Sequence, residues 1–270
     1  MPELPEVETT RRGIQPWVEG HRVERVVVRE PRLRWRVPPR LARELSGEVV
    51  HRVERRAKYL LLHTDAGSAL LHLGMSGSLR IVRDDQPAGT HDHVDLIFEQ
   101  GHRLRLRDPR RFGCLLWSRA PTRHRLLRSL GPEPLEPGFD GAYLRQRSHK
   151  KTAPVKAFLM DAKVVVGVGN IYASEALHRA GIHPSRAAGR VSERRYQGLA
   201  QSVRDILSEA IAAGGTTLRD YVQSGGEPGG YSIQLDVYGR QGEPCHYCGA
   251  LIRRAVCGQR STFWCPHCQR

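Results

Sequence analysis

Four cysteines close to the C-terminus constrain the fold of this chain more than any other feature. They follow the spacing C-x2-C-x16-C-x2-C and are Cys245, Cys248, Cys265 and Cys268. Two such pairs offer four thiolates for the closed tetrahedral site that structural zinc prefers. We therefore predict one structural Zn²⁺ at this site. Four cysteine ligands leave no open position for catalysis, so the metal would only hold the hairpin between the two pairs.

The charge of the chain indicates a polyanionic partner. Its 270 residues include 43 Lys and Arg against 28 Asp and Glu, for a formal net charge of +15. A surplus of this size is typical of nucleic-acid-binding proteins, which release condensed counterions when they bind. A membrane surface is the alternative partner, but no basic amphipathic helix or apolar anchor is evident. No run approaches the ~20 apolar residues of a membrane span, and the N-terminus has no signal-peptide pattern, so we expect a cytoplasmic protein.

The first half of the chain is predicted to be a short helix followed by β-strands. The helix runs from about Pro5 to Arg12, and Pro16 would end it. Patterns bounded by Gly, Pro and Asp turns predict strands at 22–30, 47–55, 58–63, 68–73, 93–98, 102–107 and 113–118. In one of them Leu104 and Leu106 alternate with arginines, which makes one face apolar and the other cationic. Antiparallel strands at this spacing indicate a β-sandwich or barrel.

Beyond a proline-rich stretch at 131–140, the pattern changes to helical spacing. Apolar residues mark three helices, at Val155, Phe158, Leu159 and Ala162, at Ala173, Ala176, Leu177 and Ala180, and at Leu199, Val203, Ile206 and Ala210. Gly214 and Gly215 would close the third helix. The glycine-rich segment 216–230 is expected to be a mobile loop. The chain therefore divides into a β domain, a helical domain and a metal-bound tail.

A glycine-rich turn precedes the second of these helices. Gly167 and Gly169 permit unusual backbone angles and the close approach of another backbone. Asn170 is expected to cap the helix that follows. The exposed N–H groups of such a helix start can bind a phosphate. A plain helix connection is the alternative, and the net charge and the zinc site favour the phosphate site.

Two loops combine an apolar side chain with positive charge or tight turns. One carries Arg110, Arg111 and Phe112 in the sequence DPRRFG, and the other carries Met75 in HLGMSGS. An apolar side chain on a turn often belongs to the core. The arginine pair suggests another use, as a wedge that enters a base stack.

Other charged residues carry weaker signals. His91 and His93 could bind a metal, but no third ligand lies nearby, so a phosphate contact or a structural role is favoured. Lys58 begins a strand, where most lysines are solvated. At the N-terminus, removal of Met1 would leave Pro2 with a free secondary amine. The pKa of an α-amino group is about 7.7–8, so part of it would be neutral and nucleophilic at pH 7; an ordinary helix start is the alternative.

These residues lie in longer motifs that occur in one order along the chain. The motifs are MPELPEVET, RRAKYLLLH, HLGMSGSL, HDHVDL, DPRRFG, LGPEPL, VVGVGNIYASE, AGIHP, DVYGRQGEPC and GQRSTFWC. With them the chain closely resembles the bacterial formamidopyrimidine-DNA glycosylase (8-oxoguanine-DNA glycosylase) family over essentially its whole length. The resemblance implies an α+β multidomain fold. Its parts would be an N-terminal β-sandwich domain with an N-terminal helix (1–134), a helix–two-turn–helix domain with a lesion-capping loop (135–235) and a zinc-finger hairpin (236–270).

The resemblance also implies catalytic roles for matching positions. Pro2 would attack C1′ of the damaged nucleoside, and Glu3 would act as general acid and help to open the sugar. Lys58 and Arg260 match proton donors or DNA contacts of the elimination steps. The activity would be excision of oxidised purines from duplex DNA through a Pro2 imine, followed by strand cleavage by β,δ-elimination. Neither a redox cofactor nor a catalytic metal is expected.

The DNA contacts implied by the resemblance fall in both halves of the chain. Met75, Arg110 and Phe112 match the triad that fills the space left by the extruded base and meets the opposing cytosine. DNA-binding positions fall on His91, Arg110, Lys151 and Asn170. The loop from about Thr217 to Tyr238 would close over the damaged base. The partner would be damaged double-stranded DNA at the nucleoid, bound by a monomer, since no apolar seam or heptad suggests an oligomer.

Two other functions are compatible with parts of this pattern. One is the sister endonuclease VIII branch, which prefers oxidised pyrimidines; PELPEVE and the set of Met75, Arg110 and Phe112 argue against it. The other is a zinc-bearing DNA-binding protein without catalysis. Mere binding does not require the combination of Pro2, Glu3, Lys58 and Arg260, which argues against that function.

Overall fold

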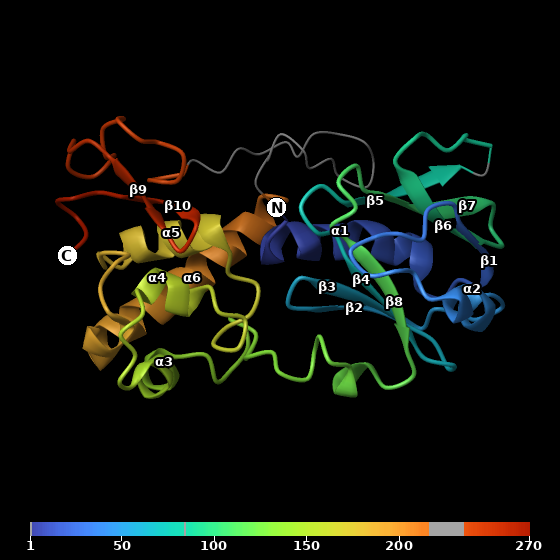
Figure 1. Cartoon of the computed structure of the whole chain (residues 1–270), viewed down its shortest axis with the longest axis horizontal. Coiled ribbons are helices and arrows are strands. Elements are labelled where there is room, and N and C mark those ends of the chain that lie inside the picture. The colour runs from blue at the N-terminus through green and yellow to red at the C-terminus, as the bar shows by residue number, and fades with distance from the viewer. Residues whose placement is uncertain (1, 84, 216–234) are drawn as a thin grey trace. The chain divides into compact units, whose positions relative to one another are not determined.

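The computed structural model describes residues 2–83, 85–215 and 235–270. The predicted loop at 216–230, and most of the predicted capping loop, therefore lie outside the described residues. The described chain forms two compact units, one with residues 2–128 and 213–215 and the other with 129–212 and 235–270 (Figure 1). Within the described residues, no helix has both the length and the apolar character that crossing a membrane requires.

Two four-stranded antiparallel sheets form the first unit. One has the order β1-β6-β7-β5, with β1 at Val23–Val28, β5 at Ser78–Arg83, β6 at Asp92–Phe98 and β7 at His102–Arg107. The other has the order β2-β3-β4-β8, with β2 at Arg52–Arg56, β3 at Tyr59–His63, β4 at Ser68–His72 and β8 at Cys114–Ser118. The predicted β-sandwich is confirmed. The prediction missed β5, although the alternation of Leu79 and Ile81 with polar residues was a signal for it.

Helix α1 (Leu4–Val18) packs against β2, β3 and β5 and buries Val7, Ile14 and Val18 in the core of this unit. The predicted end of the helix at Pro16 is wrong, because Pro16 lies inside the last turn. A proline there deprives only one earlier carbonyl of its helical hydrogen bond, and the burial of Val18 offsets that loss. The short helix α2 (Pro39–Leu45) was not predicted either, since its seven residues show too little periodicity.

The arginines on the cationic face predicted for β7 form ion pairs with aspartates of the same unit. Arg105 is only 3% exposed and donates to both carboxylate oxygens of Asp95 on the neighbouring strand β6, at 2.9 and 3.0 Å. Arg29 donates to the same carboxylate at 2.7 Å. Burial alone would raise the pKa of Asp95, but these arginines hold it below its ordinary value. The alternation is therefore real, but its arginines stabilise the sheet.

Helices dominate the second unit. They are α3 (Gly141–Ser148), α4 (Val155–Leu159), α5 (Asn170–Arg179) and α6 (Glu193–Ala212), with α6 packed against α3 and α5. The predicted helices correspond to α4, α5 and α6, but α4 ends before Ala162 and α3 was missed. The hairpin of β9 (Arg253–Cys257) and β10 (Arg260–Trp264) follows, with β10 against α5 (Figure 1). This is the predicted arrangement of a helical domain and a zinc-finger hairpin.

Candidate active site and nucleic-acid interface

The N-terminus of α1 buries two carboxylates next to Pro2. Glu3 is 2% exposed and Glu6 is fully buried. The backbone N–H of Glu3 donates to Oε2 of Glu6 at 2.8 Å, as part of a capping box between the two residues. Both carboxylates are therefore held within a few residues of Pro2, at the positive end of the helix dipole. The sequence analysis missed Glu6, which the spacing of a capping box could have revealed.

The two loops that were predicted to carry a wedge lie against each other. Met75 is 39% exposed and Phe112 is 43% exposed, so neither side chain belongs to the core. The guanidinium of Arg110 lies over the Phe112 ring, with its Cζ 4.8 Å from the ring centroid. Gly74 has a φ of +65°, and a Cβ there would lie 2.4 Å from the backbone carbon of Phe112. The structure therefore brings Met75, Arg110 and Phe112 to one end of the sandwich.

A histidine that the sequence analysis did not single out holds the first of these loops. Nδ1 of His72 accepts a hydrogen bond from the backbone N–H of Gly74 at 2.9 Å. Burial, with the positive charges of Lys58 and Arg34, lowers the pKa of His72 to about 4. The ring is therefore neutral at pH 7, which this acceptor role requires. Lys58, which was predicted to begin a strand, lies instead in the turn between β2 and β3, near enough to His72 for its charge to lower the pKa of that ring.

The two predicted histidines have different environments. His93 is 5% exposed, and its Nε2 donates to the backbone carbonyl of Asp108 at 2.8 Å, which is a structural role. His91 is only partly buried, and its ring lies 6.5 Å from that of His93. His91 is thus the one of the two that remains available for a phosphate.

Four non-glycine residues of the described chain have left-handed backbone conformations, with φ between 55° and 62°. Each such residue costs about 1–3 kcal/mol, and such strain clusters at functional sites. Every one of the four adjoins a predicted site residue: Ala57 precedes Lys58, Arg111 lies between Arg110 and Phe112, Lys150 precedes Lys151, and Gln259 precedes Arg260. This coincidence supports the predicted site by an argument independent of the sequence motifs.

In the second unit, Asn170 contacts the zinc-finger hairpin. It is the first residue of α5 and Gly169 is the N-cap, so the predicted cap is wrong. The Asn170 side chain turns away from its own helix, and its Nδ2 donates to the backbone carbonyl of Ser261 at 3.1 Å. Lys156, which is 2% exposed, donates to the same carbonyl at 3.1 Å. These bonds hold the strand that begins with the exposed Arg260.

Another carboxylate in α5 was missed by the sequence analysis. Glu175 accepts hydrogen bonds from the backbone N–H groups of Asp236, Val237 and Tyr238, at distances of 2.7–3.1 Å. Burial raises its pKa, although these three donors act in the opposite direction. Nδ2 of Asn170 also lies 3.5 Å from the hydroxyl of Tyr238.

Lys151, a predicted DNA-binding residue, is exposed and lies near the start of α4.

The four predicted zinc ligands come together. Their sulfur atoms lie within 4.8 Å of one another, with 3.9 Å between Cys245 and Cys268 and 3.4 Å between Cys248 and Cys265. Tetrahedral Zn–S bonds of about 2.3 Å place sulfurs about 3.8 Å apart, so the set fits Zn²⁺. Burial, and then the neighbouring thiols, raise the pKa of Cys268, so the four need a cation to ionise together. The predicted structural zinc site is confirmed.

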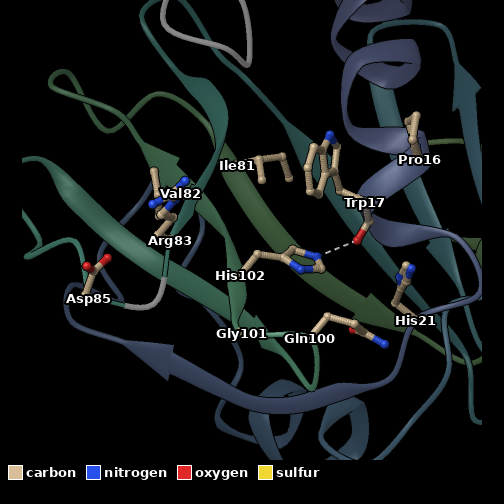
Figure 2. Close-up of a pocket in the computed structure, with 10 residues that line it drawn as sticks. All are labelled: Pro16, Trp17, His21, Ile81, Val82, Arg83, Asp85, Gln100, Gly101 and His102. Carbon is tan, nitrogen blue, oxygen red and sulfur yellow. Dashed lines mark hydrogen bonds between the residues drawn. The ribbon is translucent and has the colours of Figure 1, made fainter.

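A pocket of about 1000 Å³ lies in the first unit, near the C-terminal end of α1. Figure 2 shows Trp17, Ile81 and His102 among the side chains that line it. Nε2 of His102 donates a hydrogen bond to the backbone carbonyl of Trp17 at 2.6 Å. Trp17 is near the C-terminal end of α1, and the helix has 15 residues. At 1.5 Å per residue it is about 22 Å long, so the pocket is about that far from Pro2. None of the predicted site residues lines it.

Three family models match successive parts of the chain. They describe a formamidopyrimidine-DNA glycosylase N-terminal domain at residues 1–115, a formamidopyrimidine-DNA glycosylase H2TH domain at 130–222 and a zinc finger found in FPG and IleRS at 242–270. The fold and the site thus define a zinc-bearing DNA glycosylase. More narrowly, the chain belongs to the formamidopyrimidine-DNA glycosylase family.

Individual relatives match over the full length of the chain. A formamidopyrimidine-DNA glycosylase of Syntrophotalea carbinolica is 60% identical over 271 residues, and the match covers 100% of this chain and 100% of that protein. Among solved structures, the MutM (Fpg) protein of Thermus thermophilus is 39% identical with a TM-score of 0.89, over 99% of this chain and 98% of that one. A Lactococcus lactis Fpg mutant in complex with Fapy-dG-containing DNA is 33% identical with a TM-score of 0.91, over 100% of both chains.

Proposed function

We propose that this protein is a base excision repair enzyme that removes oxidised purines from duplex DNA and then cleaves the strand. It combines DNA glycosylase and AP lyase activities. The observation that carries this proposal is the N-terminus of α1, where Pro2 lies next to the buried carboxylates of Glu3 and Glu6. Solved relatives support the substrate class, since they include Fpg with abasic-site DNA and MutM with DNA that contains carbocyclic 8-oxo-G.

The first step is attack on the sugar by the N-terminus. Removal of Met1 frees the secondary amine of Pro2, and the damaged nucleotide is flipped out of the duplex because its C1′ is unreachable inside the stack. The amine nitrogen forms a bond to C1′ as the glycosidic bond breaks, and the base leaves with the electron pair of that bond and a proton. Glu3 is the general acid of this step and of sugar opening.

The second step uses the cation that results. A secondary amine gives an iminium that is positively charged without protonation, and it draws electrons from C2′. Loss of a C2′ proton expels the 3′ phosphate, and a further elimination expels the 5′ phosphate. Lys58 and Arg260 serve these eliminations as proton donors or phosphate contacts. One covalent intermediate thereby divides base removal and strand cleavage into easier steps. The zinc ion contributes only structure, by holding the hairpin that carries Arg260.

The remaining site residues bind DNA. Met75, Arg110 and Phe112 fill the space of the extruded base, and Arg110 with Phe112 meets the opposing cytosine. His91, Arg110, Lys151 and Asn170 are DNA-binding residues. By this assignment residues 1–134 carry the chemistry, 135–235 bind DNA and cap the lesion, and 236–270 form the zinc finger. The protein acts as a monomer in the cytoplasm, on the DNA of the nucleoid.

Parallel cleavage assays on two duplexes test this function. We expect excision of 8-oxoguanine opposite cytosine to be at least about tenfold faster than excision of dihydrouracil, since a site that hydrogen-bonds one base rejects a base that cannot make the same bonds. The product should be a gap with phosphate at both ends, which gel mobility distinguishes from a single elimination. Faster cleavage of the dihydrouracil duplex would assign the protein to the pyrimidine branch. Tight binding of both duplexes without cleavage of either would make it a DNA-binding protein without catalysis.

A further inference from the structure

Asp108 is the first residue of the loop that carries Phe112, and it is fully buried. It follows strand β7 directly. Its Oδ1 accepts a hydrogen bond from the hydroxyl of Ser76 at 2.8 Å, in the loop that carries Met75. Its Oδ2 accepts the backbone N–H of Gly113 at 2.7 Å, at the end of the loop that carries Phe112. One carboxylate therefore joins two loops that are far apart in the sequence.

The backbone of Asp108 is fixed as firmly as its side chain. Its N–H donates to the carbonyl of His91 at 3.0 Å, and its carbonyl accepts Nε2 of His93 at 2.8 Å and the N–H of Arg111 at 3.1 Å. The backbone of Asp108 is thus anchored to His91 and to His93 of strand β6, which ties the start of its loop to the sandwich. The carboxylate sets the position of both loops relative to the sandwich.

Ser76 adds a second connection between the loops. Its hydroxyl donates to Asp108 and accepts the backbone N–H of Arg110 at 3.2 Å. Met75 directly precedes Ser76, and the backbone N–H of Arg110 is bonded to the Ser76 hydroxyl, so these bonds hold the backbone beside both side chains. The close approach of Gly74 to the backbone of Phe112 completes the contact between the loops.

We propose that Asp108 and Ser76 are positioning residues that lock Met75, Arg110 and Phe112 into one preformed wedge. This inference rests on the proposed function, because it assigns the wedge to extrusion of the damaged base. Neither residue touches the reacting atoms. By holding the two loops in place beforehand, they remove the free-energy cost of ordering these loops when the base is extruded. Small misplacements of a positioned group can lower the rate of excision strongly, so the bonds matter for that rate.

The proposal separates two reactions of the same enzyme. Excision of a damaged base requires that the base first leaves the stack, so it depends on the wedge. Cleavage at a preformed abasic site has no base to extrude and depends on the wedge much less. A merely structural role for Asp108 and Ser76 would lower both reactions together, through loss of folded protein.

Ser76→Ala is the sharpest variant, because it removes one hydrogen bond of the Asp108 carboxylate and leaves the other, from Gly113, in place. We expect single-turnover excision of 8-oxoguanine opposite cytosine to fall about tenfold, which corresponds to one lost hydrogen bond to a charged group. Abasic-site cleavage should stay within about twofold of wild type, and the unfolding midpoint should fall by only a few degrees, about the cost of one hydrogen bond. Ser78→Ala is the matched control, since its hydroxyl takes no part in these bonds. Asp108→Asn should retain most of the excision rate that Asp108→Ala loses, because the asparagine amide can accept the N–H of Gly113 and donate to the Ser76 hydroxyl.

Fluorescence of 2-aminopurine reports the wedge without any catalysis. The base is placed next to an uncleavable abasic-site analogue opposite cytosine, and insertion of the wedge unstacks it. We expect Ser76→Ala to reduce the fluorescence rise at saturating protein, and Ser78→Ala to retain it. An unchanged rise in Ser76→Ala, or an equal loss of both cleavage reactions, would overturn the proposal. A wild-type protein that inserts the wedge but cleaves neither substrate would instead overturn the proposed function and leave the positioning role supported.

Discussion

Replacing Glu3 by glutamine is expected to lower excision of 8-oxoguanine roughly 10²–10⁴-fold, the usual contribution of a positioned general acid. The amide cannot donate the proton that the leaving base and the opening sugar require. Cleavage at a preformed abasic site should be affected much less, since no base must leave and the sugar opens spontaneously. The fold should survive, because the amide oxygen of glutamine can still accept the backbone N–H of Glu6 in the capping box, and the bond from the Glu3 backbone to Glu6 is unchanged.

Single-turnover rates on the two substrates measure this separation. Glu24→Gln is a suitable control, because Glu24 is an exposed glutamate on β1 of the same unit. Equal losses of excision and abasic-site cleavage in Glu3→Gln would show that Glu3 supports the nucleophile or the fold and is not the acid of base removal. An unchanged excision rate would remove Glu3 from the mechanism.

Loss of the zinc site is expected to have the second large effect. Among the described residues of the C-terminal segment, the buried apolar side chains beside two of the zinc ligands are Val237, Ile252 and Phe263, with Tyr238 and Ala250 partly buried against them. This is too little apolar surface to fold alone. Structural zinc contributes an apparent ~10–16 kcal/mol to such sites. Without it the bonds of Lys156 and Asn170 to Ser261 would lose their partner, and Arg260 would lose its place.

Cys268→Ser tests this prediction, with Cys257→Ser as the matched control within the same hairpin. We expect Cys268→Ser to lose its zinc and to bind lesion duplex at least about 100-fold more weakly at fixed salt, since the hairpin and its positive charges leave the interface. Cys257→Ser should retain the metal and the affinity. Metal analysis and a binding titration give both results. Full zinc content in Cys268→Ser, or loss of zinc in Cys257→Ser, would show that the ligand set is wrong.

The parts of the site that sequence reasoning identified are those encoded locally. The zinc ligands follow from two short spacings, and the loops around Met75 and Phe112 follow from apolar residues placed in turns. Residues whose partners are distant were missed. Glu175 binds backbone groups 61–63 positions further along, and Asp108 binds Ser76 32 positions away. Neither carboxylate differs in its local sequence from a solvated one, so only the folded chain shows what it holds.

The fold shows the same division between local and tertiary effects. The sandwich and the three longer helical patterns were predicted from periodicity, whereas the short α2 and α3 have too few turns for a clear pattern. Pro16 illustrates an override of a local rule, because the burial of Val18 carries α1 past it. Arg105 was assigned to a cationic face, and its burial depends on Asp95 in the adjacent strand.

Borohydride trapping tests the central claim, that the N-terminal amine of Pro2 forms a covalent bond to the damaged nucleotide. The protein without Met1 is incubated with a duplex that contains 8-oxoguanine opposite cytosine, and the reductant converts any imine into a stable adduct. We predict a protein–DNA band whose DNA is attached to the N-terminal peptide, and much weaker trapping by Pro2→Gly. A band attached at another residue, or cleavage without any trapped adduct, would contradict the account.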